Sequence, residues 1–434
     1  MAKRPGSARD GGASAGDVTV NQDVPLVTMD ESRTVLAKSE WWTYPLGVFL
    51  VSRAIVFGAS FLALKIFYTP GLPMPWRVAP GNLWIDGWVR WDSGWYLRII
   101  AEGYFYNPAA ESAVAFFPLY PLLVKGLTPF CGSAVVAGIL LSNLCFLAAL
   151  LVFFSWARQV GLSVNAAQRA VWYLAISPVA FFFSAVYTES LFLLLVVLSV
   201  YLAGARHWFL AAVAAALASS TKVVGILMWG VLGLMWMEAH GWRWSRIAVR
   251  ENWAELGKAL RTRWRSFLAL QVAPLGMAGY MIYLYAAFGD PLVFLHTQQH
   301  WGRADGGVWA AFSEAWSVLS ERDWWGSAGD WFPPENQAHF LWDFSLGLLV
   351  LATVPFVFRR FGPALGMLAL LILLVPLSSG TFVSMARYTV ILFPVFAVWG
   401  TFGGRVWVDR AISGLFILFL VICTAMFALW RGIV

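Results

Sequence analysis

The sequence predicts an all-helical protein that crosses a membrane many times. Of its 434 residues, 60% are hydrophobic and only 12% are charged, whereas an average soluble domain carries about 25% charged residues. Apolar runs of about 20 residues, each long enough to span a bilayer as a helix, recur along most of the chain. Lysines and arginines are dispersed between these runs, so the net charge of +7 does not indicate nucleic-acid binding.

The apolar runs divide the chain into a tail and one membrane domain. Residues 1–40 lack apolar periodicity and are predicted to form a disordered cytoplasmic tail, and residues 41–434 form the transmembrane domain. About eleven spans are predicted: 44–67, 134–157, 170–186, 190–205, 209–220, 223–237, 266–288, 340–358, 364–377, 388–400 and 411–430. The main connections are external loops 68–133 and 289–339 and a basic cytoplasmic loop, 238–265.

The stretch from residue 209 to residue 237 decides the orientation. The polar run 219–222 allows either one long helix or two short ones. With two helices, loop 238–265 lies on the side of the tail, and that side then holds about twice as many lysines and arginines as the other. Because positively charged loops stay in the cytoplasm, we expect two helices and a cytoplasmic tail.

The first external loop carries a candidate catalytic carboxylate. Trp91, Trp95 and Ile99 recur at helical spacing and suit the headgroup level, which predicts a helix lying in the membrane interface. Asp92 falls in the first turn of this helix. Its carboxylate either caps the helix or acts as a general base that deprotonates an acceptor hydroxyl arriving from outside.

Several more polar residues collect on the predicted external face, as a site built from distant segments requires. Glu189 follows an apolar stretch, where a carboxylate is costly unless it starts a helix or is paired within a site. Lys222 and Arg387 either extend to the lipid headgroups or neutralise the phosphate of a lipid-linked substrate. The candidate substrate-binding residues are Trp91, Glu102, Tyr187, Glu189, His300 and Arg303.

No cofactor and no metal ion is expected. His296 and His300 are four residues apart, but two nitrogens without a nearby third ligand make a poor metal site. The sequence also lacks an Asp-x-Asp pair of the kind that holds a divalent cation in nucleotide-sugar enzymes.

Three motifs follow one another along the chain. They are Trp91-Asp92 with Ile99-Ile100-Ala101-Glu102-Gly103-Tyr104, the segment 115–121 (Ala-Phe-Phe-Pro-Leu-Tyr-Pro), and the segment 182–192 with Tyr187-Thr188-Glu189 at its centre. In this order they resemble the phosphatidylinositol-glycan class V mannosyltransferases and their bacterial relatives. The resemblance extends weakly through residues 288–291 to 387–388. It departs from the eukaryotic pattern at 221–225, where Lys222 stands in place of Arg and Asn before the glycine.

The resemblance implies a GT-C type glycosyltransferase fold with its active site on the non-cytoplasmic side. It implies a polyprenyl-phosphate sugar, typically mannose, as donor, and it assigns the role of base to Asp92. The hypothesis is a single inverting displacement onto a glycolipid or lipid-linked acceptor, with Lys222 or Arg387 stabilising the leaving phosphate. A composition rich in Ala, Gly, Trp and Arg favours a bacterial plasma membrane.

Two other functions remain open on the sequence. A transporter or lipid flippase carries ionisable residues near mid-membrane, as Arg53 and Lys65 are in the first span, although no internal repeat is evident. A non-catalytic membrane scaffold would keep the fold and bind a partner through its loops.

Overall fold

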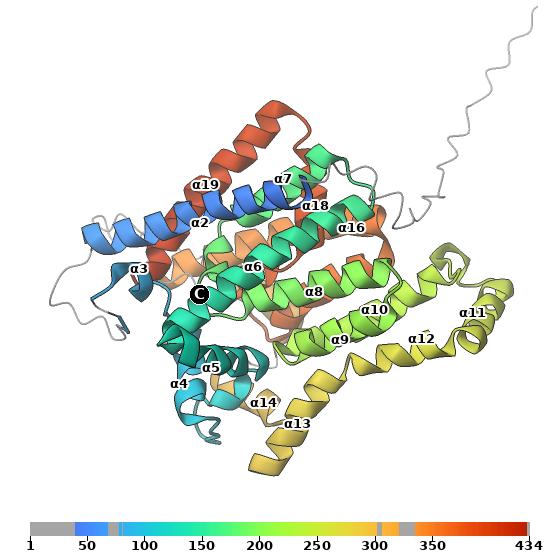
Figure 1. Ribbon diagram of the computed structural model, residues 1–434, viewed down its shortest axis with the longest axis horizontal. Coiled ribbons are helices and arrows are strands. Elements are labelled where there is room, and N and C mark those ends of the chain that lie inside the picture. Colours follow the sequence, from blue (N-terminus) through green and yellow to red (C-terminus); the bar gives the residue numbers. More distant parts are fainter. Residues whose placement is uncertain (1–39, 68–77, 80, 302–305, 321–334, 432–434) are drawn as a thin grey trace, which may run out of the picture.

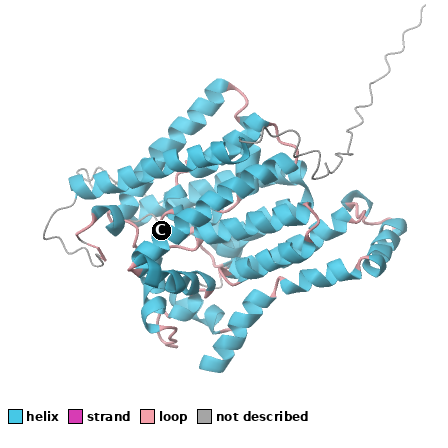
Figure 2. Ribbon diagram, in the orientation of Figure 1, coloured by secondary structure: helices cyan, strands magenta, loops and turns pink. Residues whose placement is uncertain are grey.

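Every regular element in the described part of the chain is a helix (Figure 2). The computed structural model describes residues 40–67, 78–79, 81–301, 306–320 and 335–431. Five of its helices are long and apolar enough to cross a membrane: Trp41–Phe67, Ala134–Gln159, Trp264–Phe288, Phe340–Ser378 and Val406–Ala428. The prediction of an all-helical, polytopic protein is confirmed, whereas the predicted number of eleven spans is not.

The central bundle is built from long and short apolar helices. Their bounds are α2 (Glu40–Phe67), α6 (Ala134–Gln159), α7 (Val164–Ala175), α8 (Glu189–Gly204), α9 (Trp208–Ser219), α16 (Glu335–Ser378), α18 (Phe393–Phe402) and α19 (Val406–Ala428). α6 packs against α8, α8 against α9, α7 against α18, and α2 against α19. The pair α7 and α18 is close at Gly400, where an added Cβ would lie 2.5 Å from the carbonyl oxygen of Ala166.

Shorter elements lie at the two ends of this bundle (Figure 1). One end carries α3 (Leu83–Asp86), α4 (Asp92–Glu102), η1 (Ala113–Ala115), α5 (Leu119–Cys131) and α14 (Val293–His296). The opposite end, where α2 begins, carries α11 (Arg250–Thr262), which leads into α12 (Trp264–Ala269) and α13 (Leu275–Phe288). The start of the membrane domain and the basic loop therefore share one end, as the positive-inside argument requires.

Two predicted helix breaks are confirmed. α9 ends at Ser219, and α10 (Leu227–Ala239) begins only after the short η3 (Val223–Ile226), so residues 209–237 form two helices. Within α16 the chain turns at Gly362, whose φ of 83° is left-handed, and this separates the predicted spans 340–358 and 364–377.

The predicted span 170–186 is wrong as a continuous helix. α7 ends at Ala175, and a buried segment of turns that includes η2 (Ala180–Phe183) leads to α8. The break follows from Pro178, which has no amide hydrogen to donate and disfavours helical geometry at Ser177.

The predicted span 388–400 is also interrupted. Two residues separate the end of α17 (Met385–Val390) from the start of α18, and Pro394 occupies the first turn of α18. Because proline fits the first turn of a helix, where its missing amide hydrogen costs nothing, it starts a new helix here rather than continuing the old one.

Arg53 of α2 binds the irregular segment that follows α7. Its guanidinium donates to the carbonyl oxygens of Ala175 at 3.2 Å and Ala180 at 3.1 Å and to Ser184 Oγ at 2.9 Å. Backbone groups outside regular helices must find partners when they are buried in a membrane protein. These hydrogen bonds give Arg53 a structural role, so its presence in the span no longer indicates a transport path.

We predict that Arg53→Met destabilises the protein while leaving its surface unchanged. The substitution leaves two buried carbonyls without this donor, at a cost of about 1–3 kcal/mol each. Thermal unfolding of the detergent-solubilised protein measures the effect, with Lys65→Met, an exposed cation on the same helix, as control. Equal midpoints for the two variants would contradict the role of Arg53.

Candidate functional site

Four charged side chains from four separate elements meet at one point. Arg387 of α17 donates through Nε to Glu189 Oε1 at 2.9 Å and through Nη1 to Asp92 Oδ2. Lys222, just before η3, donates to the same Glu189 oxygen at 2.8 Å. Asp92 lies in the first turn of α4, and Glu189 is the first residue of α8. We call these four residues the ion cluster.

The ion cluster is graded in exposure. The side chain of Glu189 is 0% exposed, those of Arg387 and Lys222 are 11% and 13% exposed, and that of Asp92 is 20% exposed. Two carboxylates balance two cations, so each buried charge has a counter-charge, without which burial is strongly unfavourable. Asp92 therefore forms the outer edge of the cluster and Glu189 its base.

Aromatic rings surround the two cations. The Arg387 guanidinium lies 4.8 Å from the ring centroid of Tyr187, and Lys222 Nζ lies 5.6 Å from that of Tyr388. Burial lowers the pKa of Arg387, but the carboxylates of Asp92 and Glu189 outweigh this and raise its pKa well above the usual value. Arg387 is accordingly a permanent cation.

Three polar atoms of the cluster make no hydrogen bond within the described residues. Glu189 Oε2 is buried without a hydrogen-bond partner among the described residues. Asp92 accepts through Oδ2, and Arg387 donates through Nε and Nη1. Asp92 Oδ1 and Arg387 Nη2 therefore make no hydrogen bond within the same part of the chain. The cluster thus offers an acceptor at Asp92 Oδ1 and a guanidinium donor at Arg387 Nη2 to a bound molecule, whereas Glu189 Oε2 is enclosed by protein.

Asp92 is not the N-cap residue of α4. That position belongs to Trp91, whose side chain forms no capping hydrogen bond. Trp91 has a φ of 43°, a strained conformation for a bulky residue. Its ring centroid lies 5.3 Å from that of Phe427 and 5.1 Å from that of Trp430. This packing against α19 and the residues that follow it fixes the start of α4 and with it the place of Asp92.

Asp343 holds the element that carries Arg387. It is buried in α16, and its two carboxylate oxygens accept the backbone amides of Ser384 at 2.9 Å and Ala386 at 2.7 Å, at the start of α17. Ser384 has a φ of 66°, which needs such support. The role of Asp343 was not predicted from the sequence, although a lone carboxylate in the predicted span 340–358 was a signal.

Lys222 is positioned by the tight turn that ends α9. Its amide donates to the carbonyl of Ala218 at 3.1 Å, and Gly225 donates back to the carbonyl of Lys222 at 2.9 Å. A Cβ on Gly225 would lie 2.3 Å from the Ala218 oxygen, so only glycine allows this approach.

The remaining predicted site residues have different positions. Tyr187 lies beside Arg387, and burial raises its pKa, so it stays a neutral phenol that donates to the carbonyl of Arg90 at 3.2 Å. Glu102 is exposed and pairs with Arg98 at 2.8 Å, and His300 contacts the carbonyl of Pro108 at 2.9 Å. Arg303 lies outside the described residues.

His296 does not pair with His300. Its Nδ1 lies 2.7 Å from Asp290 Oδ2 at the surface. Across the segments that the structure describes, no three His, Cys, Asp or Glu side chains are grouped so as to hold a metal ion.

Comparison with known protein families matches a region that contains Asp92, Glu189 and Lys222 but not Arg387. The family model described as Mannosyltransferase (PIG-V) matches residues 77–305. GPI mannosyltransferase 2 of Drosophila pseudoobscura pseudoobscura is 25% identical over 130 residues, which are 28% of this chain and 28% of that protein. The match therefore spans little more than a quarter of the length of this curated relative.

Two solved structures are similar at low identity. ArnT from Cupriavidus metallidurans bound to undecaprenyl phosphate has a TM-score of 0.47 and 16% identity, covering 82% of this chain and 59% of that one. The oligosaccharyltransferase of Archaeoglobus fulgidus tethered with an acceptor peptide has a TM-score of 0.44 and 13% identity, covering 91% of this chain and 55% of that one.

We predict that Asp343→Asn loosens α17 and lowers stability. An amide keeps one acceptor oxygen, so one of the two buried amide donors loses its partner, at a cost of about 1–3 kcal/mol. Thermal unfolding measures the loss, with the exposed carboxylate variant Glu255→Gln as control. An unchanged midpoint for Asp343→Asn would show that α17 holds its place without this contact.

Proposed function

Because this chain belongs to the mannosyltransferase (PIG-V) family, we propose that it is a membrane glycosyltransferase of the GT-C type. Its donor is a polyprenyl-phosphate sugar, with mannose as the proposed sugar, and its acceptor is a glycolipid or another lipid-linked molecule. The matched residues 77–305 include three members of the ion cluster, Asp92, Glu189 and Lys222. The observation that carries the proposal is the ion cluster, in which the partly exposed carboxylate of Asp92 contacts Arg387, and the buried carboxylate of Glu189 contacts both Arg387 and Lys222.

Asp92 is the proposed general base. It is the most exposed carboxylate of the cluster, and its Oδ1 makes no hydrogen bond within the described residues. In the proposed step, Oδ1 takes the proton of the acceptor hydroxyl as the hydroxyl oxygen attacks the anomeric carbon. The bond from that carbon to the phosphate oxygen breaks, the lipid phosphate leaves with the electron pair, and the configuration inverts.

Lys222 and Arg387 are the proposed phosphate-binding residues. Arg387 keeps Nη2 available, and Lys222 uses one of its three ammonium hydrogens on Glu189. Charge-assisted hydrogen bonds from both would stabilise the leaving phosphate as its negative charge grows. Glu189 holds the two cations together, and we propose that Tyr187 and Trp91 border the same site.

We further propose that this site faces the non-cytoplasmic side of a bacterial plasma membrane. The excess of lysine and arginine on the tail's side supports this orientation. α4, which carries Asp92, lies at the end of the bundle opposite α11 (Figure 1). Roles for Glu102, His300 and Arg303 in acceptor binding stay predictions.

Asp92→Asn is expected to lower sugar transfer by about 10²–10⁴-fold, the usual contribution of a general base, while the protein remains folded. Transfer of labelled mannose from a polyprenyl-phosphate donor to native lipid extract measures it. Glu111→Gln removes an exposed carboxylate from the same external loop and serves as the matched control. Full activity in Asp92→Asn would overturn the proposed base, and a carrier or scaffold would transfer no sugar even without the substitution.

Lys222→Gln is expected to raise the KM for the lipid donor about tenfold or more, since a charge-assisted hydrogen bond to phosphate is lost. Glu189 keeps its contact with Arg387 in this variant, and the thermal unfolding midpoint checks that the protein remains folded. Steady-state kinetics at varied donor concentration test the expectation, with Lys125→Gln, an exposed lysine of α5, as control. A KM equal to that of Lys125→Gln would assign Lys222 to structure alone.

A further inference from the structure

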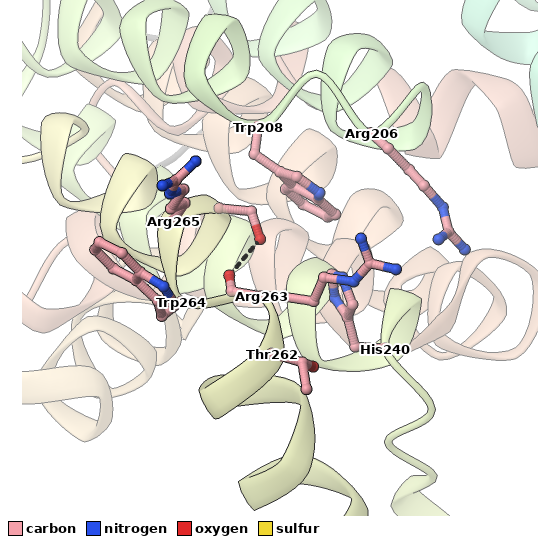
Figure 3. Close-up of a pocket in the computed structure, with 8 residues that line it drawn as sticks. Arg206, Trp208, His240, Thr262, Arg263, Trp264 and Arg265 are labelled. Atoms are coloured by element: carbon pink, nitrogen blue, oxygen red, sulfur yellow. Dashed lines mark hydrogen bonds between the residues drawn. The ribbon is translucent and has the colours of Figure 1, made fainter.

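A cavity lies at the end of the bundle opposite α4. It has a volume of about 550 Å³ and is lined by Arg206, Trp208, His240, Thr262, Arg263, Trp264, Arg265 and Ser266 (Figure 3). These residues come from the turn between α8 and α9, the end of α10, and the junction of α11 with α12. None of them belongs to the ion cluster.

The cavity is strongly basic. Among the described residues, Arg206, Arg263 and Arg265 form no ion pair with any carboxylate. Arg206 donates to the carbonyl of Ala239 at 3.3 Å, which leaves its positive charge uncompensated. Figure 3 shows the guanidinium groups of Arg206 and Arg263 extending into the same space beside the ring of His240. Such a pair matches the oxygens of a phosphate.

The walls of the cavity are aromatic. Trp208 is nearly buried, and Trp264 is 52% exposed. Arg265 lies over the Trp264 ring, at 5.6 Å from its centroid. Tryptophan is enriched at the level of lipid headgroups, and the apolar helix Trp264–Phe288 begins at the cavity itself. Both features are typical of a site at the level of the headgroups.

The neighbouring helix α11 has the character of an element on a membrane surface. It carries three cations, Arg250, Lys258 and Arg261, against two carboxylates, Glu251 and Glu255. Exposed apolar side chains project from it and from the turn before it: Ile247, Val249 and Trp253. Basic helices with an apolar face lie in the interface and favour anionic lipids.

We propose that this cavity binds the headgroup of an anionic phospholipid. The lipid phosphate lies between Arg206 and Arg263, and its acyl chains leave along the exposed face of Trp264. The bound lipid joins the turn between α8 and α9 to the start of α12. This site is independent of sugar transfer, so failure of the proposed function would leave it untouched.

Thermal unfolding of the full-length protein in neutral detergent tests the proposal. Added phosphatidylglycerol is expected to raise the unfolding midpoint more than phosphatidylcholine does, because a ligand that binds the folded state stabilises it. Arg206→Gln combined with Arg263→Gln is expected to lose at least half of this difference. Arg359→Gln combined with Arg360→Gln, a pair predicted for the same side but outside the cavity, is expected to keep it.

Three outcomes would overturn the proposal. One is an equal response of the two double variants to phosphatidylglycerol, and another is a shift of the same size with inorganic phosphate, which would assign the site to a free anion. Photoactivatable phosphatidylglycerol, applied to the unmodified protein, covers the case in which the variant fails to fold. Labelling is expected within residues 206–208 or 262–266, and labelling only elsewhere would contradict the site.

Discussion

The ion pairs of Arg387 with Asp92 and Glu189 connect parts of the protein that are distant in the chain. Asp92 and Glu189 are the first residues of α4 and α8, and Arg387 lies within α17. A guanidinium this deeply buried is stable only beside counter-charges, and a carboxylate as buried as Glu189 has the same need. The arrangement of the loop that contains α4, the segment after α7 and the segment before α18 therefore depends on one shared electrostatic requirement.

The residues of the site lie at breaks between helices, and charged side chains stabilise the backbone at these breaks. Helix ends leave amide and carbonyl groups without intrahelical partners. After α7, Arg53 donates to two such carbonyls, and before α17, Asp343 accepts two such amides. A charged residue within an apolar span thus provides hydrogen-bond partners for the backbone where a neighbouring helix is interrupted.

The sequence predicted those parts of the site that depend on local pattern. Apolar length indicated most helices, positive-inside counting separated α9 from α10, and isolated charges singled out Asp92, Glu189, Lys222 and Arg387. The break after Ala175 was missed because apolar and aromatic residues continue through the turns. The pairing of Asp92 with Arg387, 295 positions apart, and the work of Asp343 are tertiary contacts that no local window contains.

One oxygen atom of Glu189 receives both Lys222 Nζ and Arg387 Nε. This common acceptor limits the distance between the two nitrogens, which cannot exceed the summed lengths of the two hydrogen bonds. A single phosphate group can bridge that span with two of its own oxygens, as a bidentate ligand does. Glu189 thereby limits the distance between the two cations, although in the proposed reaction its carboxylate would not contact the sugar.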